Sequence, residues 1–243
     1  MNHATLAANL TDALDLQIVP VAIAFADAEL AGQVPSIEKS APSACSFWRR
    51  AETRVFYAAA EAHYNCPIGA MVMGFNLPKV VSDELSGLVE GMVGCGYVLN
   101  DEPNHIPVIK KSSLGIIYGP LNIFPVKPDI VLCWLNPSQA MIWNEASGGA
   151  KWGATEPSTI FGRPACAALP ASTDKSRPTL SLGCIGMRTF TDISEDRLLG
   201  AVPGSCLSDF VSKLQDLKVT NSNMARIYES RRAAFTLQER SAP

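Results

Sequence analysis

The sequence predicts an α/β or α+β protein with two pseudo-symmetric, internally duplicated halves packed around a central seam. Two observations predict it: short apolar segments alternate with helix-like segments, and a set of segments recurs in the same order in both halves. The chain has 243 residues, of which 47% are hydrophobic and 18% charged, as is typical of a globular protein with a substantial core. We expect a single compact domain over 1–243, with halves at 16–105 and 106–217 and a C-terminal helical tail at 218–243.

The predicted elements of the first half begin with a helix at 6–14, where apolar residues recur at helical spacing. An apolar strand follows at 18–26. A short helix is expected at 46–52 and a strand at 54–60. Ser82 opens the segment "SDELSGLVEGM" and is a residue type that often caps helices, so we expect a helix to start there.

The predicted elements of the second half follow the same mixed pattern. Pro137 suits the first position of a helix, and a glycine-rich loop or joint is expected at 147–158. The other expected elements are strands at 114–121, 128–136 and 179–183 and an amphipathic helix at 206–217. These strands and helices together favour the mixed fold class.

Composition and charge exclude several classes of partner. The formal net charge is −3 and there is no basic block, so binding to nucleic acid or to an anionic membrane surface is not expected. No apolar run approaches the roughly 20 residues of a spanning helix. The N-terminus lacks the basic and apolar regions of a signal peptide, so we expect a cytoplasmic protein. In that compartment its seven cysteines are expected to be thiols or metal ligands rather than disulfides.

Four cysteines lie at corresponding places in the two halves. Cys45 and Cys66 enclose one predicted strand, and Cys166 and Cys184 enclose another. Each pair ends in a similar element, "CPIG" in the first half and "CIG" in the second. The segments before the two pairs also correspond: they are "PVAIAFADA" and "DIVLCWLNPSQA". The segments after the pairs are "SDELSGLVEG" and "SEDRLLGAVPG". Duplicated units usually pack as a pseudo-twofold pair, so we expect all four cysteines to face one another across the seam. Their sulfurs should then fit within a sphere about 7 Å across, as a cubane cluster requires.

The spacing of these cysteines bears on which metal they could hold. Zinc sites usually contain two cysteines separated by two to four residues, and no such pair occurs in this chain. A [4Fe–4S] cluster needs four thiolates, and backbone N–H groups beside small residues can hydrogen-bond its sulfurs. Gly69, Gly183 and Gly186 are candidates for that role. Buried cysteines also pack as small apolar residues, so the sequence leaves the ligand and core interpretations of the four equally open. For Cys95, Cys133 and Cys206 we favour the core interpretation.

Polar residues accompany two of the four cysteines. His63, Tyr64 and Asn65 precede Cys66, and Arg188 follows Cys184 by four residues. We expect these four to line a pocket beside the sulfurs, in which Arg188 offsets negative charge or orients an anionic ligand and His63 moves protons near neutral pH. The plainer interpretation is that Arg188 forms a surface ion pair and that His63 is structural.

Several motifs resemble, in the same order, those of an uncharacterised bacterial and archaeal family, domain of unknown function 169. They are "PVAIAF", "HYNCPIGA", "YGPL", "PDIVLCWLNPSQAM", "GRPACAALP" and "SLGCIGMRTFTD", and the resemblance covers about residues 16–217. The resemblance implies family cysteines at the positions of Cys45, Cys66, Cys166 and Cys184. It implies no reaction.

Our leading hypothesis is a [4Fe–4S] protein with a redox or substrate-processing role, whether as an oxidoreductase, a lyase or no enzyme at all. The second hypothesis is a non-enzymatic module that binds zinc, copper or a metallocofactor, and the third is a metal-free, thiol-dependent enzyme. The partner would be a small molecule or a redox protein, and the sequence permits a homodimer.

Overall fold

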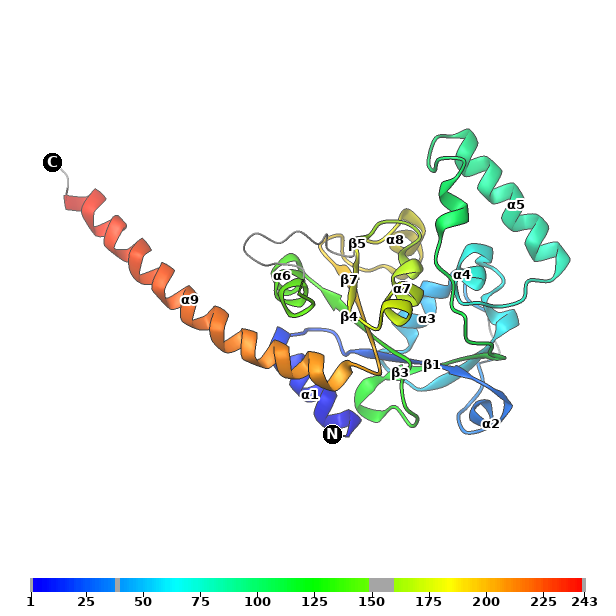
Figure 1. Ribbon diagram of the computed structural model, residues 1–243, viewed down its shortest axis with the longest axis horizontal. Coiled ribbons are helices and arrows are strands. Elements are labelled where there is room, and N and C mark those ends of the chain that lie inside the picture. Colours follow the sequence, from blue (N-terminus) through cyan, green and yellow to red (C-terminus); the bar gives the residue numbers. More distant parts are fainter. Residues whose placement is uncertain (1, 38–39, 149–159, 242–243) are drawn as a thin grey trace.

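In the computed structural model, which describes residues 2–37, 40–148 and 160–241, seven strands form one mixed sheet in the order β2-β3-β1-β4-β7-β6-β5 (Figure 1). Neighbouring strands are antiparallel except β5 and β6, which are parallel. The strands are β1 (Val21–Ala26), β2 (Phe56–Ala59), β3 (Gly115–Pro120), β4 (Ile130–Leu135), β5 (Ile160–Phe161), β6 (Thr179–Ser181) and β7 (Leu198–Pro203). The predicted mixed class, α/β or α+β, is therefore confirmed.

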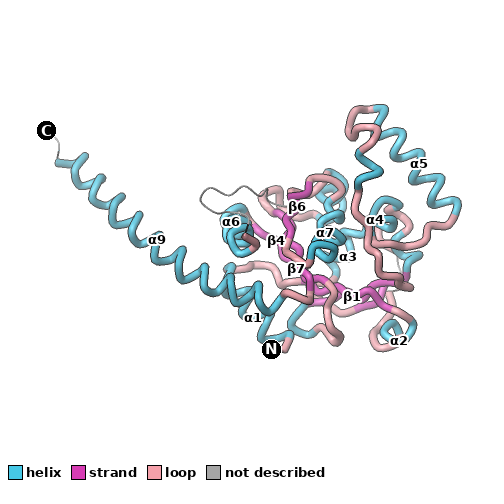
Figure 2. The backbone as a smooth tube through the Cα atoms, in the orientation of Figure 1, coloured by secondary structure: helices cyan, strands magenta, loops and turns pink. Residues whose placement is uncertain are grey.

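Helices cover both faces of this sheet (Figure 2). The α-helices are α1 (His3–Leu14), α2 (Ala28–Ala31), α3 (Ala44–Arg50), α4 (Pro67–Val72), α5 (Lys79–Gly94), α6 (Pro137–Ala146), α7 (Ala168–Lys175), α8 (Ile185–Thr191) and α9 (Leu207–Ser241). Short 3-10 helices are η1 (Ala60–His63), η2 (Glu102–His105), η3 (Leu121–Ile123) and η4 (Ala165–Ala167). Among the described residues, no helix combines the length and the apolar character that a membrane-spanning segment needs.

The sheet separates two apolar cores, because successive side chains of a strand point to opposite faces. In β1, Val21, Ile23 and Phe25 join one core, whereas Ala22 and Ala24 join the other. The first core contains buried residues of α3, α4, α7 and α8, and the second contains buried residues of α1, α6 and α9. All six residues of β1 are buried, which explains why this strand reads as a continuous apolar run.

The two flanks of the sheet have a matched strand order around the antiparallel β1–β4 pair. On one side β1 is followed outward by β3 and β2, and on the other side β4 is followed by β7 and β6. An internal duplication stays a prediction. One of its supposed correspondences is wrong, because "SDELSGLVEG" lies in helix α5 whereas "SEDRLLGAVPG" contains strand β7. In addition, β3 pairs with β1 and β2, although the predicted boundary at residue 106 assigned it to the second half.

Most predicted elements are present with shifted ends. Helix α5 begins at Lys79, so the predicted start at Ser82 is wrong; Pro78, whose φ of −59° is fixed by its ring, stands at the N-cap. The predicted tail is not a separate element, because α9 runs without a break from Leu207 to Ser241. The predicted loop at 147–158 lies mostly outside the described residues.

A close backbone crossing joins β4 to the end of β7. The backbone N–H of Gly204 donates to the carbonyl oxygen of Asp129 over 2.8 Å. A Cβ atom at position 204 would collide with the carbonyl oxygen of Pro128. This crossing therefore requires a residue without a side chain.

We predict that Gly204→Ala lowers the free energy of unfolding by about 1–3 kcal/mol, the usual cost of forcing extra volume into a packed site. Gly91→Ala in α5 is the control, because a Cβ there meets nothing within 4 Å. The control should leave stability unchanged or raise it by up to about 1 kcal/mol, since alanine favours helix. Urea unfolding measures both, and equal stability of the two variants would contradict the prediction.

Candidate functional site

The four candidate cysteines come from four separate segments of the chain. Cys45 is in the first turn of α3, Cys66 is the N-cap of α4, Cys166 is in η4, and Cys184 is the N-cap of α8. Helix α3 contacts both α4 and α8, and α4 contacts η4. These contacts bring together all four segments on the first core's face of the sheet. None of the four cysteines is in a disulfide.

The thiols lie within electrostatic range of one another. The pKa of Cys45 is raised well above its ordinary value near 9, first by burial and then by the charges of Cys166, Cys184 and Cys66. The pKa of Cys166 is raised by burial and then by Cys66 and Cys184. Without a bound cation, Cys45 and Cys166 are therefore neutral thiols at neutral pH.

The site is buried on one side and reaches the surface on the other. Cys45 and Cys166 are only 6% and 4% exposed, whereas Cys66 and Cys184 are half-buried. Apolar side chains that neighbour Cys184 in the sequence are exposed, with Leu182 at 53%, Ile185 at 66% and Phe190 at 46%. A molecule approaching from outside would meet an apolar surface beside Cys184.

Backbone geometry explains the glycine before Cys184. Gly183 has a φ of +86°, in the left-handed region that residues with a Cβ rarely adopt. A Cβ there would also lie 2.6 Å from Cε of Met187. The turn directs Cys184 into the N-cap position, where its Sγ accepts a hydrogen bond from the backbone N–H of Met187 over 3.4 Å.

Gly69 and Gly186, predicted to play equivalent roles, have different surroundings. A Cβ on Gly69 would lie 2.9 Å from Cβ of Ala44 and 3.0 Å from Sγ of Cys66. Gly69 therefore lets α4 pack closely against α3 beside the cysteines. Gly186 is exposed, and a Cβ there would meet nothing within 4 Å, so no steric reason requires this glycine.

His63 lies behind the cysteines in a fully buried hydrogen-bonded pair with Tyr118. His63 Nδ1 is 2.8 Å from the carbonyl oxygen of Ala59, which can only accept, so Nδ1 carries the proton. His63 Nε2 then accepts from the hydroxyl of Tyr118 over 2.9 Å. The imidazole also packs against the rings of Phe47 and Phe75, with centroids 4.7 and 4.9 Å away.

Burial lowers the pKa of His63 to about 4, because the charged imidazolium would be desolvated. The prediction that His63 moves protons near neutral pH is therefore wrong. Sequence reasoning missed Tyr118, whose pKa is raised by burial and then by Cys45 and Cys166. The "YGPL" motif contains this tyrosine, but only the folded chain places it against α3, where its ring stacks on that of Phe47, two residues after Cys45.

The other predicted polar residues form hydrogen bonds to groups other than His63. Arg188 donates to the carbonyl oxygens of Leu182 and Arg197, over 2.8 and 3.1 Å. Tyr64 donates its hydroxyl to the carbonyl oxygen of Asn76, and Asn65 is exposed and donates to Ser40. Arg188 thus supports the backbone around α8, which corrects its predicted role as an anion holder.

The remaining cysteines have three different environments. Cys133 is 1% exposed within β4, as expected of a core residue. Cys206 is half-buried. Cys95 is exposed at the end of α5, so its predicted place in the core is wrong.

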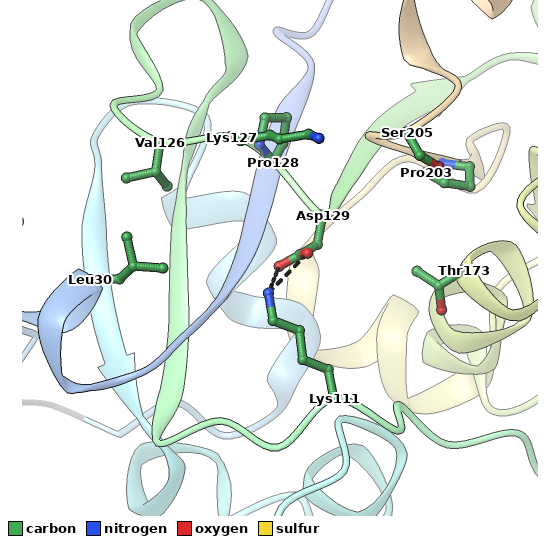
Figure 3. A pocket seen from close by; sticks show the side chains of 9 residues that line it. All are labelled: Leu30, Lys111, Val126, Lys127, Pro128, Asp129, Thr173, Pro203 and Ser205. Carbon is green, nitrogen blue, oxygen red and sulfur yellow. Dashed lines mark hydrogen bonds and ion pairs between the residues drawn. The ribbon is translucent and has the colours of Figure 1, made fainter.

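A separate hollow of about 440 Å³ opens beside the start of β4 (Figure 3). Its centre is an ion pair, in which Lys111 Nζ lies 2.9 Å from Oδ2 of Asp129 while the same carboxylate accepts from the backbone N–H of Phe25. Its lining residues are Leu30, Lys111, Val126, Lys127, Pro128, Asp129, Thr173, Pro203 and Ser205. It includes none of the predicted site residues.

A metal ion is usually held by several His, Cys, Asp or Glu side chains around one point. Among the described residues, no group of three or more His, Cys, Asp or Glu side chains is placed to hold one. The four thiols are close enough to influence one another's ionisation.

The buried His63 predicts a pH dependence of stability. Its folded-state pKa of about 4 is below the ordinary 6.5, so the unfolded chain binds this proton more readily. His63 then contributes at most about 3 kcal/mol above pH 6.5, and this contribution is lost as pH falls towards 4. Urea unfolding of the metal-free protein should show a smaller fall over that window in His63→Gln than in wild type. Parallel pH profiles would contradict the assignment.

The two site glycines give a second, matched prediction. Gly69→Ala should lower the free energy of unfolding by about 1–3 kcal/mol, because the new methyl group presses on Ala44 and Cys66. Gly186→Ala should leave it unchanged or slightly higher, since the added Cβ meets open space in a helix. Thermal or urea unfolding distinguishes them, and a larger loss in Gly186→Ala would reject the packing described for α3 and α4.

Comparison with known proteins agrees with the resemblance noted in the sequence. No curated protein and no solved structure matches the chain. Residues 9–213 match the family described as Uncharacterised ArCR, DUF169, and this range contains all four candidate cysteines, together with His63 and Tyr118. The chain therefore belongs to the DUF169 family.

Proposed function

We propose that Cys45, Cys66, Cys166 and Cys184 bind a [4Fe–4S] cluster and that the protein has a redox or substrate-processing role. One observation carries this proposal: four thiols come from four distant segments that contact one another, and Cys66, Cys166 and Cys184 all raise the pKa of Cys45. Four thiolates are the ligand set that a cubane cluster requires.

Cys133 shows why ordinary core packing is the weaker interpretation. Its pKa is raised by burial alone, as expected of a thiol surrounded by apolar side chains. Cys45 is equally buried, but three other thiols contribute to its raised pKa. Clustering thiols in this way gives no packing advantage over apolar residues, whereas it suits a shared cationic ligand.

The spacing of the cysteines along the chain favours a cluster over zinc, because no two of them are separated by the two to four residues usual in zinc sites. Zinc–sulfur bonds of about 2.3 Å place tetrahedral ligands about 3.8 Å apart. A cubane distributes its ligands over a sphere about 7 Å across. Binding would require Cys45 and Cys166 to lose their protons, so affinity should fall as pH is lowered.

The residues around the site suit electron transfer better than proton transfer. When bound, such a cluster supplies one-electron chemistry at a potential set by hydrogen bonds to its sulfurs and by solvent exposure. The backbone N–H of Met187 already donates to Sγ of Cys184. Cys66 and Cys184 are half-buried, so a redox protein or a small molecule could approach on that side. His63 is neutral and fully bonded, which argues against acid–base catalysis by this residue. The unpaired cysteines fit a reducing compartment such as the cytoplasm.

Iron and sulfide analysis of anaerobically prepared protein tests the proposal. We expect about four iron and four sulfide per chain and a brown colour with broad absorption near ~400 nm. Cys45→Ser and Cys184→Ser should each lose most of this iron and lower the melting temperature, because the cluster cross-links distant segments.

Cys133→Ala and Cys206→Ala are the matched controls, since neither thiol contributes to the raised pKa of Cys45 or Cys166. They should keep full iron content. Colourless protein with one zinc per chain would contradict the cluster and support the metal-binding alternative. Iron that persists in both the Cys45 and the Cys184 variant would reject these ligands.

A further inference from the structure

Helix α9 extends far beyond the body of the protein (Figure 1). Its first part packs against α1 and α6, and Leu207, Phe210, Val211 and Leu214 are buried there. Further along the helix, Asn221 Nδ2 donates to Oε2 of Glu145 in α6 over 3.0 Å. Every described side chain of α9 beyond that point, 222–236, is exposed.

The face of α9 that packs on the body continues along the exposed part. The side chains of α9 that contact the body are spaced alternately four and three residues apart. They are Phe210, Leu214, Leu217 and Asn221. The same alternation continues with Met224, Tyr228, Arg231 and Phe235. This is the heptad spacing of a coiled coil. Met224 is 42%, Tyr228 62% and Phe235 61% exposed, so the second half of the pattern is uncovered.

A lone helix of this kind is poorly stabilised in water. Isolated helices of about 15 residues are marginal, and most helical stability in proteins comes from packing an apolar face. The exposed part has such a face, which Ile227 widens with a side chain that is 53% exposed. A partner helix packed on this face would stabilise the exposed part of α9.

We propose that the exposed part of α9 pairs with the same segment of a second copy in antiparallel orientation. In an antiparallel coiled coil the two kinds of core position face each other, so Met224 lies opposite Phe235 of the second copy. Tyr228 then lies opposite Arg231, whose guanidinium can stack on the phenol ring. Both layers occur twice by the twofold symmetry, giving four consecutive, self-complementary layers.

A parallel pair is disfavoured on two grounds. It would place Arg231 against its own copy in the core, where two like charges repel. In a parallel pair the two bodies would also lie at the same height along the helices and would compete for the space between them. Each body covers the face of α9 up to Asn221 that continues into the paired face. The antiparallel arrangement places the bodies at opposite ends of the paired segment, and only the last turn of each α9, 238–241, reaches the level of the partner's body.

Light scattering coupled to size exclusion, or sedimentation, tests the pairing with the full chain. Wild type should be a dimer at about 200 µM and dissociate on dilution, as expected of a short interface. Phe235→Asp should be monomeric. Ala233→Asp is the matched control, with the same charge on the opposite face of the helix, and should stay dimeric. A monomeric wild type, or a dimeric Phe235→Asp, would overturn the proposal.

A charge exchange tests the orientation. Met224→Lys alone and Phe235→Glu alone should each weaken the dimer at least tenfold. The double variant should recover it, because antiparallel pairing brings each lysine opposite a glutamate. Parallel pairing would put lysine against lysine instead. A double variant as weak as the sum of the single ones would overturn the antiparallel pairing. These readouts do not depend on iron, so they are independent of the proposed cluster.

Discussion

The antiparallel pairing of β1 with β4 is the constraint on which the rest of the structure depends. Val21, Ala22 and Ile23 pair with Leu132, Val131 and Ile130 at the centre of the sheet. This pairing joins a flank built by residues 21–120 to one built by residues 130–203. Because every side chain of both strands is buried, neither can slip by one residue without moving its apolar set to the other core. The register is therefore fixed, and with it the positions of the helices on each face.

The cysteine site follows from that register. Strands β2 and β6 lie in the outer part of each flank, and each is preceded and followed by a segment that carries one cysteine. The connecting helices return over the same face, where Phe47 of α3 stacks on Tyr118 of β3 with ring centroids 5.5 Å apart. Thiols held there cannot ionise easily, because burial and mutual repulsion both oppose negative charge. A bound cation or cluster would offset the unfavourable energy of the negative thiolates. The fold therefore places thiols where a positively charged ligand would stabilise their ionised form.

Sequence reasoning succeeded where a pattern is local. The apolar run of β1 and the proline that opens α6 predicted their elements, whereas the ligand role of the four cysteines singled out by the paired spacing stays a prediction. It failed where the answer depends on distant residues. In the sequence His63 lies near Cys66 and looks catalytic. In the structure the hydroxyl of Tyr118, 55 positions away, donates to Nε2 of His63, and burial lowers the pKa of His63. Arg188 looks free until the carbonyl oxygens of Leu182 and Arg197 are seen around it. Gly69 and Gly186 occupy similar places after a cysteine in the sequence, but their surroundings differ. A Cβ on Gly69 would press on Ala44 of α3, whereas a Cβ on Gly186 would meet nothing within 4 Å.

The central claim is that four thiols from distant segments form one site suited to an iron–sulfur cluster. X-ray absorption at the iron edge of the anaerobically prepared protein tests it most directly, because this method reports the atoms bound to iron regardless of activity. We expect a first shell of sulfur alone and a second shell of neighbouring iron, as in a cubane. A first shell of oxygen or nitrogen with no iron neighbour would contradict it.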